Sequence, residues 1–397
     1  MVLIESVGAV QERLRRAGLD GWLLYDFAGS NPTARHALGL DALMLSRRLF
    51  YLIPAEGVPT VLCHRIDSGA LPPLPGKHLT YTGWRDLSAH LERLIRGGVR
   101  RVAMEYFPDG AIPSLSRIDA GTLEWLRRLG LEVLPSAELV QHFLCRLSPA
   151  QAEAHRQVAT ELDRIKGLAV GLVRERIAAD RPVTEFELQQ FLMQRFAAEG
   201  LVTDYPPTVA VGRNAADPHY LPSQDRPTPV GPDQVVLLDL LARHDRPVCA
   251  YADLTWTIYT GASPPSAVTE VFGIVVRARD AGLRFITERY DRATGLGPLG
   301  WEVDRAIREV VDGAGYGPCF PHRSGHNIGD LHGHGDGANI DDLETHDTRC
   351  LEEGLCFSLK PAIYLDDFGV RSEVNVYLGK GGPELGARPQ SELLCLC

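Results

Sequence analysis

Four ionisable side chains in the second half of the chain stand in otherwise apolar or glycine-rich stretches. Asp239 interrupts the run VVLLDLL, and Asp253 stands in YADLTWT, on what reads as the next strand. His326 lies in RSGHNIG, and Glu373 lies in VRSEVNV. Buried acids are rare in proteins unless they are paired or bind a metal ion. Ligands of this kind suit a divalent cation, although separate salt bridges and caps would use the same residue types.

Histidines form a second group of candidate functional residues. The chain has 13 histidines, and four of them fall between positions 322 and 334. Another, His219, follows Pro218 in AADPHYLP. A neutral imidazole can take up and release a proton near neutral pH, as general acid–base catalysis requires. The crowding of histidines therefore predicts a proton-transfer site.

A single lysine near the C-terminus is harder to place. The stretch GLCFSLKPAIYLDDFGVRSEVNVYL reads as two strands, Leu355–Tyr364 and Val370–Leu378, joined by a short turn. Lys360 falls inside the first strand, and Glu373 falls inside the second. A lone charge in an apolar strand is costly. The chemistry of the site therefore depends on the partners of this ammonium group.

Composition sets the class of protein and excludes some partners. The chain has 397 residues and a net charge of −10, which argues against nucleic acid or an anionic membrane as its main partner. No apolar run approaches the roughly 20 residues of a membrane span, and the N-terminal helical pattern carries Glu5 and Glu12, unlike a signal peptide. Eight scattered cysteines without a C-x-x-C pair indicate free thiols in a reducing cytoplasm. The many Arg, Ala, Gly and Pro residues suggest a GC-rich bacterial source.

The pattern of helices and strands predicts two domains that would position these residues. Residues 1–147 alternate between amphipathic helices and short strands, which is typical of an α/β domain. In RLSPAQ, Ser148 is a suitable N-cap and Pro149 a suitable first helical residue, so a long helix begins there. Further along, strands come first, helices next and strands last. This order predicts an α+β domain over residues 148–397, with helices packed on an antiparallel sheet.

Several motifs, taken in order, resemble those of the prolidase/Xaa-Pro aminopeptidase/creatinase family, whose catalytic domain has the pita-bread fold. The similarity covers nearly the whole chain, because SRRLFYLIP and RVAMEYFPDGAIP resemble the N-terminal domain of that family. Four further stretches resemble, in order, the motifs of the family's catalytic domain: PPTVAVGRNAADPHYLP, LLDL with YADLTWT, HRSGHNIG, and SLKPAIY with GVRSEV. The resemblance implies a homodimer, because creatinase-like members place an N-terminal domain over the active site of the partner.

The resemblance also implies a ligand set for two divalent ions, which the family holds with five side chains. Asp239, Asp253, His326 and Glu373 match four of these ligands, but Lys360 stands where the family has the glutamate of a Glu-Pro-Gly-Ile-Tyr motif. Two dications beside an ammonium would be repelled by several kcal/mol at an effective dielectric constant of about 20, and the carboxylates would keep the lysine protonated. We therefore expect Lys360 to replace one ion. The site then holds no cofactor or, alternatively, one divalent ion (Mn, Zn, Fe or Co) on the retained ligands.

The resemblance assigns roles to residues around this ligand set. Histidines that match His219 and His322 line the substrate site of related peptidases, and creatinase, a metal-free relative, uses the first of them as its acid/base. The third site histidine is His332 or His334, and the stretch HGDGAN, which begins at His334, favours His334. The expected catalytic residues are His219, His322, His334, Lys360, Glu373 and Asp253. The expected substrate contacts are Tyr220, His332 and Arg371.

Two departures from the family pattern weaken the expectation of ordinary peptide-terminus recognition. Trp256 stands where the family often has an arginine, and three extra residues separate Asp239 from Asp253.

Three functions follow from these residues, and the first is preferred. It is a metal-independent, creatinase-like enzyme, most simply a hydrolase, that acts at a C–N bond of a small amino-acid-like or peptide-like substrate. His219 would shuttle the proton. Glu373 and Asp253 would orient water or the substrate nitrogen, while Lys360 steadies developing negative charge.

The alternatives come from different classes of protein. One is a mononuclear, metal-dependent Xaa-Pro aminopeptidase or dipeptidase. The other is a non-catalytic binding module on the peptidase fold. The sequence leaves the substrate, and the choice between hydrolysis and elimination, open.

Overall fold

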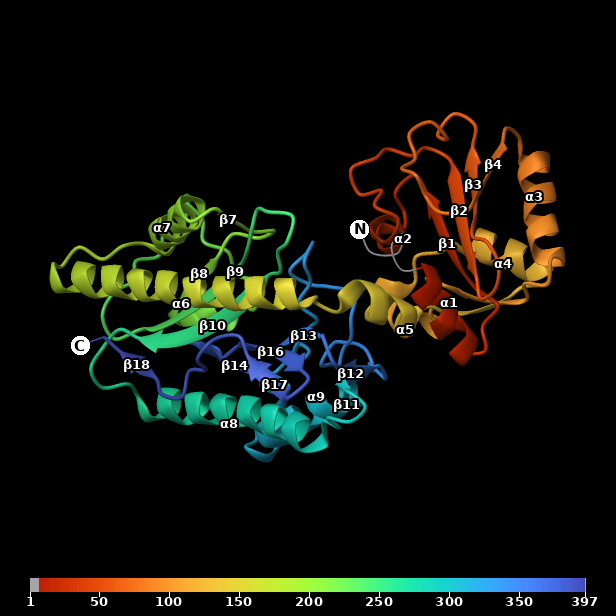
Figure 1. The fold of residues 1–397 in the computed structure, drawn as a ribbon. Helices are drawn as coiled ribbons and strands as arrows, with labels where there is room; N and C mark the ends of the chain where they lie inside the picture. Colours follow the sequence, from red (N-terminus) through yellow and green to blue (C-terminus); the bar gives the residue numbers. More distant parts are fainter. Residues whose placement is uncertain (1–6, 397) are drawn as a thin grey trace. The chain divides into compact units, whose positions relative to one another are not determined.

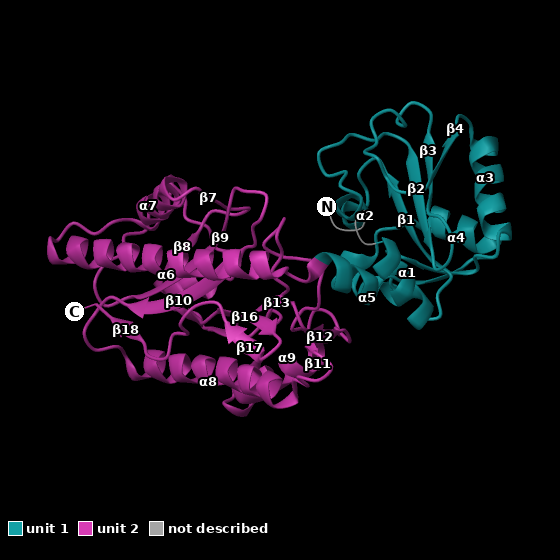
Figure 2. Cartoon of the chain, in the orientation of Figure 1, with its two compact units in different colours: residues 1–144 teal, residues 145–397 magenta. Residues whose placement is uncertain are grey.

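The computed structural model describes residues 7–396. The chain divides into two compact units, with the boundary between residues 144 and 145 (Figure 2). The long helix predicted to open the second domain is α6, Pro149–Ala178. Ser148 caps it as the sequence predicts, because its side chain accepts a hydrogen bond from the backbone N–H of Gln151. Among the described residues, no helix combines the length and the hydropathy that crossing a membrane requires.

The first unit is built on one mixed sheet of six strands in the order β4-β3-β2-β1-β5-β6. The strand β2 pairs antiparallel with β1 and β3, and the other neighbours run parallel. Leucines of α3 and α4 pack on sheet residues in one hydrophobic core, as an α/β pattern predicts. The elements are α1 Val7–Arg16, β1 Gly21–Phe27, α2 Pro32–Ala37, β2 Arg48–Pro54, β3 Thr60–His64, β4 Lys77–Tyr81, α3 Trp84–Arg96, β5 Arg101–Met104, α4 Ala120–Arg128, β6 Glu132–Pro135 and α5 Ala137–Val140.

The second unit carries its main hydrophobic core between two helices and a sheet. The strands β9 and β10 form an antiparallel pair, with β7 and β8 on the other edge of β9 and β18 parallel to β10. Apolar residues of α6 and α7 pack against these strands. The elements are α7 Glu185–Ala198, β7 Leu201–Val202, β8 Thr208–Val211, β9 Val235–His244, β10 Ala252–Tyr259 and β18 Leu394–Cys395.

The remaining elements of the second unit complete the scaffold of the site. Figure 1 shows α6 and α8 as two long helices with β10, β14 and β16 among the strands drawn between them. The strands β13, β16 and β17 form one antiparallel sheet, and the pairs β14–β15 and β11–β12 form two more. The elements are α8 Ser266–Arg289, β11 Leu296–Leu299, α9 Gly300–Gly313, β12 Cys350–Glu352, β13 Cys356–Leu359, β14 Ala362–Tyr364, β15 Gly369–Arg371, β16 Val374–Gly379 and β17 Gly382–Leu385.

The two C-terminal strands of the sequence analysis are each interrupted at the residue of chemical interest, so the expectation of continuous strands was wrong. Lys360 and Pro361 lie between β13 and β14, and Ser372 and Glu373 lie between β15 and β16. Proline has no N–H to donate to a ladder. The freed backbone groups bond to other segments instead: Lys360 N–H donates to the Ser324 carbonyl, and Glu373 N–H donates to the Thr255 carbonyl. These breaks let both side chains leave the regular alternation of a strand.

The loop that carries His326 packs so closely on β13 that a side chain at Gly325 has no room. A Cβ on Gly325 would lie 1.9 Å from the backbone oxygen of Ser358. We expect Gly325→Ala to lower the free energy of unfolding by roughly 1–3 kcal/mol, because the backbone must shift to remove the clash. Differential scanning calorimetry should show a lower unfolding midpoint.

Gly171→Ala is the matched control for this substitution. Gly171 lies inside α6, and a Cβ there meets no atom within 4 Å. Alanine should stabilise the helix by about 0.5–1 kcal/mol. Equal midpoints for the two variants would contradict the close packing at Gly325.

Candidate active site

The β9–β10 hairpin places two of the candidate carboxylates on one face. In the register of the pair, Asp239 lies opposite Thr255, and Thr255 is two residues from Asp253. Side chains two residues apart in a strand point to the same face. An isolated bridge between Thr255 and Glu373 then brings the third carboxylate to this face. The tertiary structure therefore gathers Asp239, Asp253 and Glu373, which lie far apart in the sequence.

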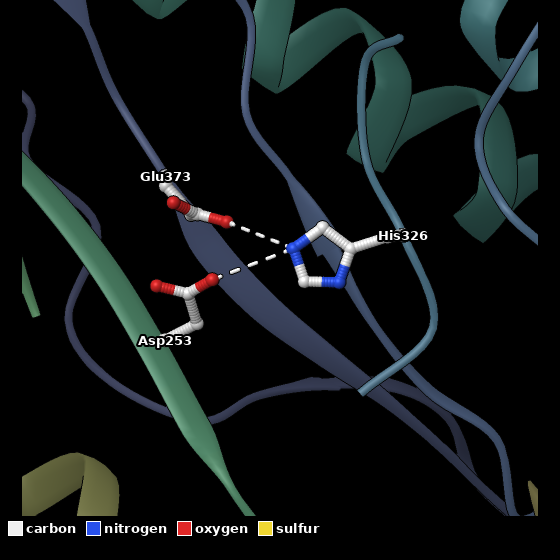
Figure 3. A group of neighbouring side chains, drawn as sticks. All are labelled: Asp253, His326 and Glu373. Atoms are coloured by element: carbon white, nitrogen blue, oxygen red, sulfur yellow. Dashed lines mark ion pairs between the residues drawn. The ribbon is translucent and has the colours of Figure 1, made fainter. Parts of the chain in front are cut away.

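A buried triad forms where the His326 loop meets these strands. One ligand atom from each of Asp253, His326 and Glu373 lies within 4.8 Å of the other two. His326 Nε2 is 3.4 Å from Asp253 Oδ2 and 3.9 Å from Glu373 Oε1 (Figure 3). His326 Nδ1 faces the carbonyl of Asn327 at 3.1 Å, which directs Nε2 toward the two acids.

The ammonium group of Lys360 lies among these three side chains. Its Nζ is 3.2 Å from His326 Nε2, 3.5 Å from Glu373 Oε1 and 3.9 Å from Asp253 Oδ2. Burial by itself would lower the pKa of Lys360, but the carboxylates of Glu373, Asp253 and Asp239 outweigh burial and raise the pKa. The lysine is therefore a fixed cation.

A second fixed cation neutralises the remaining carboxylate. The buried guanidinium of Arg371 donates to Asp239 Oδ2 at 2.6 Å, to the Tyr364 hydroxyl at 3.1 Å and to Thr255 Oγ1 at 3.3 Å. Burial acts to raise the pKa of Asp239, but Arg371 and then Lys360 reverse the shift, so the pKa is lowered. Arg371 thus binds protein side chains through all three of its nitrogens.

The two carboxylates beside Lys360 hold protons more tightly than isolated acids. Burial, followed by the charge of neighbouring carboxylates, raises the pKa of both Asp253 and Glu373. Thr255 Oγ1 donates to Glu373 Oε2 at 2.8 Å. Within residues 7–396, Asp253 Oδ1 and Glu373 Oε1 accept no hydrogen bond. These two oxygens are the unsatisfied acceptors of the site.

The donor set does not fit two metal ions. Ions of a two-metal site lie about 3.5–4 Å apart and need carboxylates between them. Here position 360 provides an ammonium, and Asp239 already bonds to Arg371 at 2.6 Å. One ion on Asp253, His326 and Glu373 would find suitable donor atoms, but Lys360 Nζ lies within 3.2–3.9 Å of the same atoms. An ion fits there only after Lys360 leaves.

Two of the predicted site histidines have neutral rings near this cluster. His322 Nδ1 donates to the Arg323 carbonyl at 2.7 Å, and its Nε2 lies 2.9 Å from the Tyr364 hydroxyl. Burial lowers the pKa of His322 to about 3. The ring of His334 lies against that of His326, with centroids 3.8 Å apart. The neighbouring His326 and then burial lower the pKa of His334. Both rings stay uncharged near neutral pH.

Of the other three predicted site residues, His219 and Tyr220 line the cavity next to Lys360, and His332 does not. His219 is exposed and lines the same cavity as Lys360. Tyr220 also lines it, but the Tyr220 hydroxyl donates to Glu185 Oε2 at 2.5 Å. His332 is 74% exposed and lies 3.6 Å from Asp204 Oδ2, so of the two neighbouring histidines it is His334 that faces the cavity.

Most of these groups, though not Glu373 or His332, line a cavity of about 860 Å³ within the second unit. Asp239, Asp253, His326, Lys360 and Arg371 line it and are called its floor here. The apolar residues that line it are called its walls, and they are Tyr205, Pro206, Pro207, Pro218, Leu221, Leu241 and Pro321. A cavity of this size takes a small molecule, with apolar contacts on the sides and few polar groups for orientation. The cavity therefore presents both charged and apolar side chains.

Sequence reasoning missed four residues that hold the site together. Tyr364 and Thr255 stand inside motifs that the analysis used, but nothing in their spacing singles them out. Arg323 and Glu344 line the cavity and form an ion pair at 2.8 Å. Only Arg323 carried a signal, as a charge directly beside His322.

The comparisons with known proteins identify the class of this fold and site. The model of metallopeptidase family M24 matches residues 150–380, so the chain belongs to that family. The prediction of the prolidase/Xaa-Pro aminopeptidase/creatinase family and of a two-domain pita-bread fold is confirmed.

Individual relatives agree with this assignment. An Xaa-Pro dipeptidase of Lactobacillus delbrueckii subsp. lactis is 33% identical over 213 residues, which are 53% of this chain and 50% of the relative. An Xaa-Pro dipeptidase of Pyrococcus furiosus is 28% identical over 207 residues, 52% and 53% of the two chains. The chain thus spans about half the length of the curated relatives it matches.

Solved structures extend the likeness of the fold to the whole chain. The crystal structure of the dipeptidase PepE from Mycobacterium ulcerans has a TM-score of 0.75 and 22% identity, with coverage of 100% of this chain and 98% of that one. A prolidase from Thermococcus sibiricus has a TM-score of 0.65 and 20% identity, covering 100% and 99%. The family is one of metallopeptidases, so the expectation of a metal-free site stays a prediction.

The position of Lys360 predicts how the site responds to a change of charge. We expect Lys360→Glu to raise the affinity for Mn²⁺ at least about tenfold over the unaltered protein, because a carboxylate ligand replaces a repelling cation. Isothermal titration calorimetry with MnCl₂ measures this affinity directly.

Lys380→Glu provides the matched control, since it makes the same change of net charge at an exposed turn after β16. It should leave Mn²⁺ affinity unchanged. Equal affinities for all three proteins would show that the ammonium does not govern ion binding.

Proposed function

We propose that this chain hydrolyses the amide C–N bond of a small Xaa-Pro-like peptide, with the Lys360 ammonium acting where a metal-binding acid would otherwise stand. The observation that carries the proposal is the position of Lys360 Nζ, 3.2–3.9 Å from the three atoms of the buried triad. The names of the relatives support peptide hydrolysis. They fit the peptidase alternative of the sequence analysis better than its creatinase-like first reading.

The apolar walls of the cavity support a substrate with an apolar ring or side chain. Tyr205, Pro206 and Pro207 line one part of the wall, and Pro218 and Leu221 line another. A prolyl ring has the size and the apolar surface that such walls accept. The charged floor would then face the scissile amide.

In the proposed reaction, the acids and Lys360 act on the attacking water and the oxyanion, and His219 acts on the leaving nitrogen. Water attacks the amide carbon, and its proton passes to the carboxylate pair of Asp253 and Glu373, whose raised pKa values suit them to hold it. The oxyanion that forms is stabilised by the ammonium of Lys360. His219 gives a proton to the leaving nitrogen as the C–N bond breaks, and solvent water carries the proton from the acid pair back to His219.

His322 has a different role in this proposal from the one expected. Both of its ring nitrogens are engaged, with Arg323 and with Tyr364, and its pKa of about 3 keeps it neutral. It therefore links the Tyr364–Arg371–Asp239 chain to the cavity wall and carries no proton in the reaction. His334 presents a neutral ring to the cavity beside His326.

A second candidate is a mononuclear metal-dependent peptidase. It is supported by the family description and by the two unsatisfied oxygens, Asp253 Oδ1 and Glu373 Oε1. An ion held there would lower the pKa of a bound water and polarise the substrate carbonyl. This candidate requires Lys360 to move away from the triad.

The expectations of a homodimer, a cytoplasmic location and a bacterial source stay predictions. The third hypothesis, a binding module without turnover, remains an outcome of the assay below.

The proposal predicts turnover that does not depend on added metal. We expect hydrolysis of the dipeptide Ala-Pro to change less than about twofold in the presence of EDTA. His219→Ala should lower kcat by about 10²–10⁴-fold, the usual contribution of general acid–base catalysis. Release of free proline, followed by chromatography, measures both effects.

His346→Ala is the control, since His346 is exposed in the same unit and pairs with Asp342 at 2.6 Å. Activity that requires added Mn²⁺ or Zn²⁺ would favour the second candidate. Binding of Ala-Pro without any cleavage would favour the binding module.

A further inference from the structure

A carboxylate outside the triad is buried and forms no ion pair with any cationic side chain of residues 7–396. Glu185, the first residue of α7, is 1% exposed. Its Oε1 accepts from the backbone N–H of Val211 at 2.7 Å, and its Oε2 accepts from the Tyr220 hydroxyl at 2.5 Å. The amide of Asn214 lies 3.1 Å from both oxygens. Hydrogen bonds alone therefore offset the cost of burying this carboxylate.

All of these donors belong to one short segment, residues 211–220, which also carries His219. Asn214 Nδ2 additionally donates to Thr228 Oγ1 at 3.2 Å. Within the segment, Asp217 Oδ1 accepts from the backbone N–H of His219 at 2.9 Å, and the Asp217 carbonyl accepts from that of Tyr220 at 3.1 Å. Glu185 thus holds the beginning of the segment through Val211 and its end through Tyr220.

The imidazole of His219 depends on this backbone for its position. The ring is exposed at the cavity, and the segment attaches to the fold on either side of it through Glu185. Burial and Glu185 raise the pKa of Tyr220 to about 12, so the phenol keeps the proton that it donates. The bond from Tyr220 is therefore intact over the whole pH range in which an imidazole titrates.

We propose that Glu185 is a positioning residue for His219, which it holds toward the cavity through the segment 211–220. The inference rests on the proposed function, in which His219 transfers the proton. It also assigns Tyr220 a different task from substrate contact, because the Tyr220 hydroxyl donates to Glu185 Oε2.

Glu105 is a matched carboxylate in the first unit. It is also 1% exposed, and it accepts from Trp22 Nε1 at 2.8 Å, Asn31 Nδ2 at 2.9 Å and Ser136 Oγ at 3.1 Å. Its donors come from three separate parts of that unit, and none of them neighbours a candidate catalytic residue. Glu105→Gln therefore measures what the loss of a buried, hydrogen-bonded charge does to stability alone.

The first measurement needs no activity. Hydrogen–deuterium exchange with mass spectrometry compares the intact chain with Glu185→Gln, Tyr220→Phe and Glu105→Gln. We expect amide exchange in residues 211–221 to rise at least about tenfold in Glu185→Gln and by less in Tyr220→Phe, because the latter removes one of the four bonds. Glu105→Gln should leave that segment unchanged.

The second measurement is the kinetics of Ala-Pro hydrolysis on the same proteins. Glu185→Gln should lower kcat by about 10–100-fold with KM within about threefold, since a displaced acid/base slows the chemical step more than binding. Glu185→Asp, which keeps the charge on a shorter side chain, should recover part of kcat. Glu105→Gln should lower the unfolding midpoint without changing either constant.

The outcomes separate this inference from the proposed function. Unchanged exchange in residues 211–221 of Glu185→Gln overturns the inference, as does a loss of kcat no greater than that of Glu105→Gln. If Glu185→Gln does not fold, Tyr220→Phe decides by the same two readouts. If the unaltered chain cleaves no peptide, the proposed function fails, while the exchange data still decide whether Glu185 positions the segment.

Discussion

The ammonium of Lys360 is the charge on which the organisation of the site depends. The Lys360 side chain is only 15% exposed, and an ammonium that loses most of its hydration is tolerated only when opposite charges surround it. Here Glu373 and Asp253 lie within 3.9 Å of Nζ, and His326 completes the cluster at 3.2 Å. Removal of this one charge would leave buried carboxylates in mutual repulsion. The lysine and the acids therefore stabilise each other.

A second cation offsets a further part of the negative charge of the site. Arg371 pairs with Asp239, so three carboxylates face two covalently attached cations. Thr255 connects the two halves, because its hydroxyl donates to Glu373 and accepts from the guanidinium of Arg371. In a metal centre the positive charge is exchangeable and depends on the supply of ions. In this arrangement it is part of the chain, and the geometry of the floor is set by packing and hydrogen bonds.

The two sides of the cavity are supported independently. The floor rests on β9, β10 and the interrupted C-terminal strands, where Asp253, His326 and Arg371 are buried and Lys360 and Asp239 are partly exposed. His219 comes from a segment whose support is Glu185 on α7. A rigid charged floor opposite an exposed imidazole suits a reaction in which charge develops at one place and a proton moves at another. In the proposed function, the apolar lining of the cavity would contact the substrate without competing for those charges.

The sequence by itself determined the class of the two domains, the start of α6 at Ser148, and the residue types of the site, including the lysine among the acids. It could do so because helix caps, hydrophobic periods and motif residues are local properties of the chain. Only the tertiary structure decided that the strands break at Lys360 and Glu373, that Arg371 pairs with Asp239, and that Tyr220 turns to Glu185. The choice of His334 over His332 at the cavity was decided in the same way. These outcomes depend on the register and the side-chain rotamers of segments more than 30 residues apart in the sequence. Asp239 and Arg371, for example, are separated by 132 positions, and local sequence does not encode their pairing.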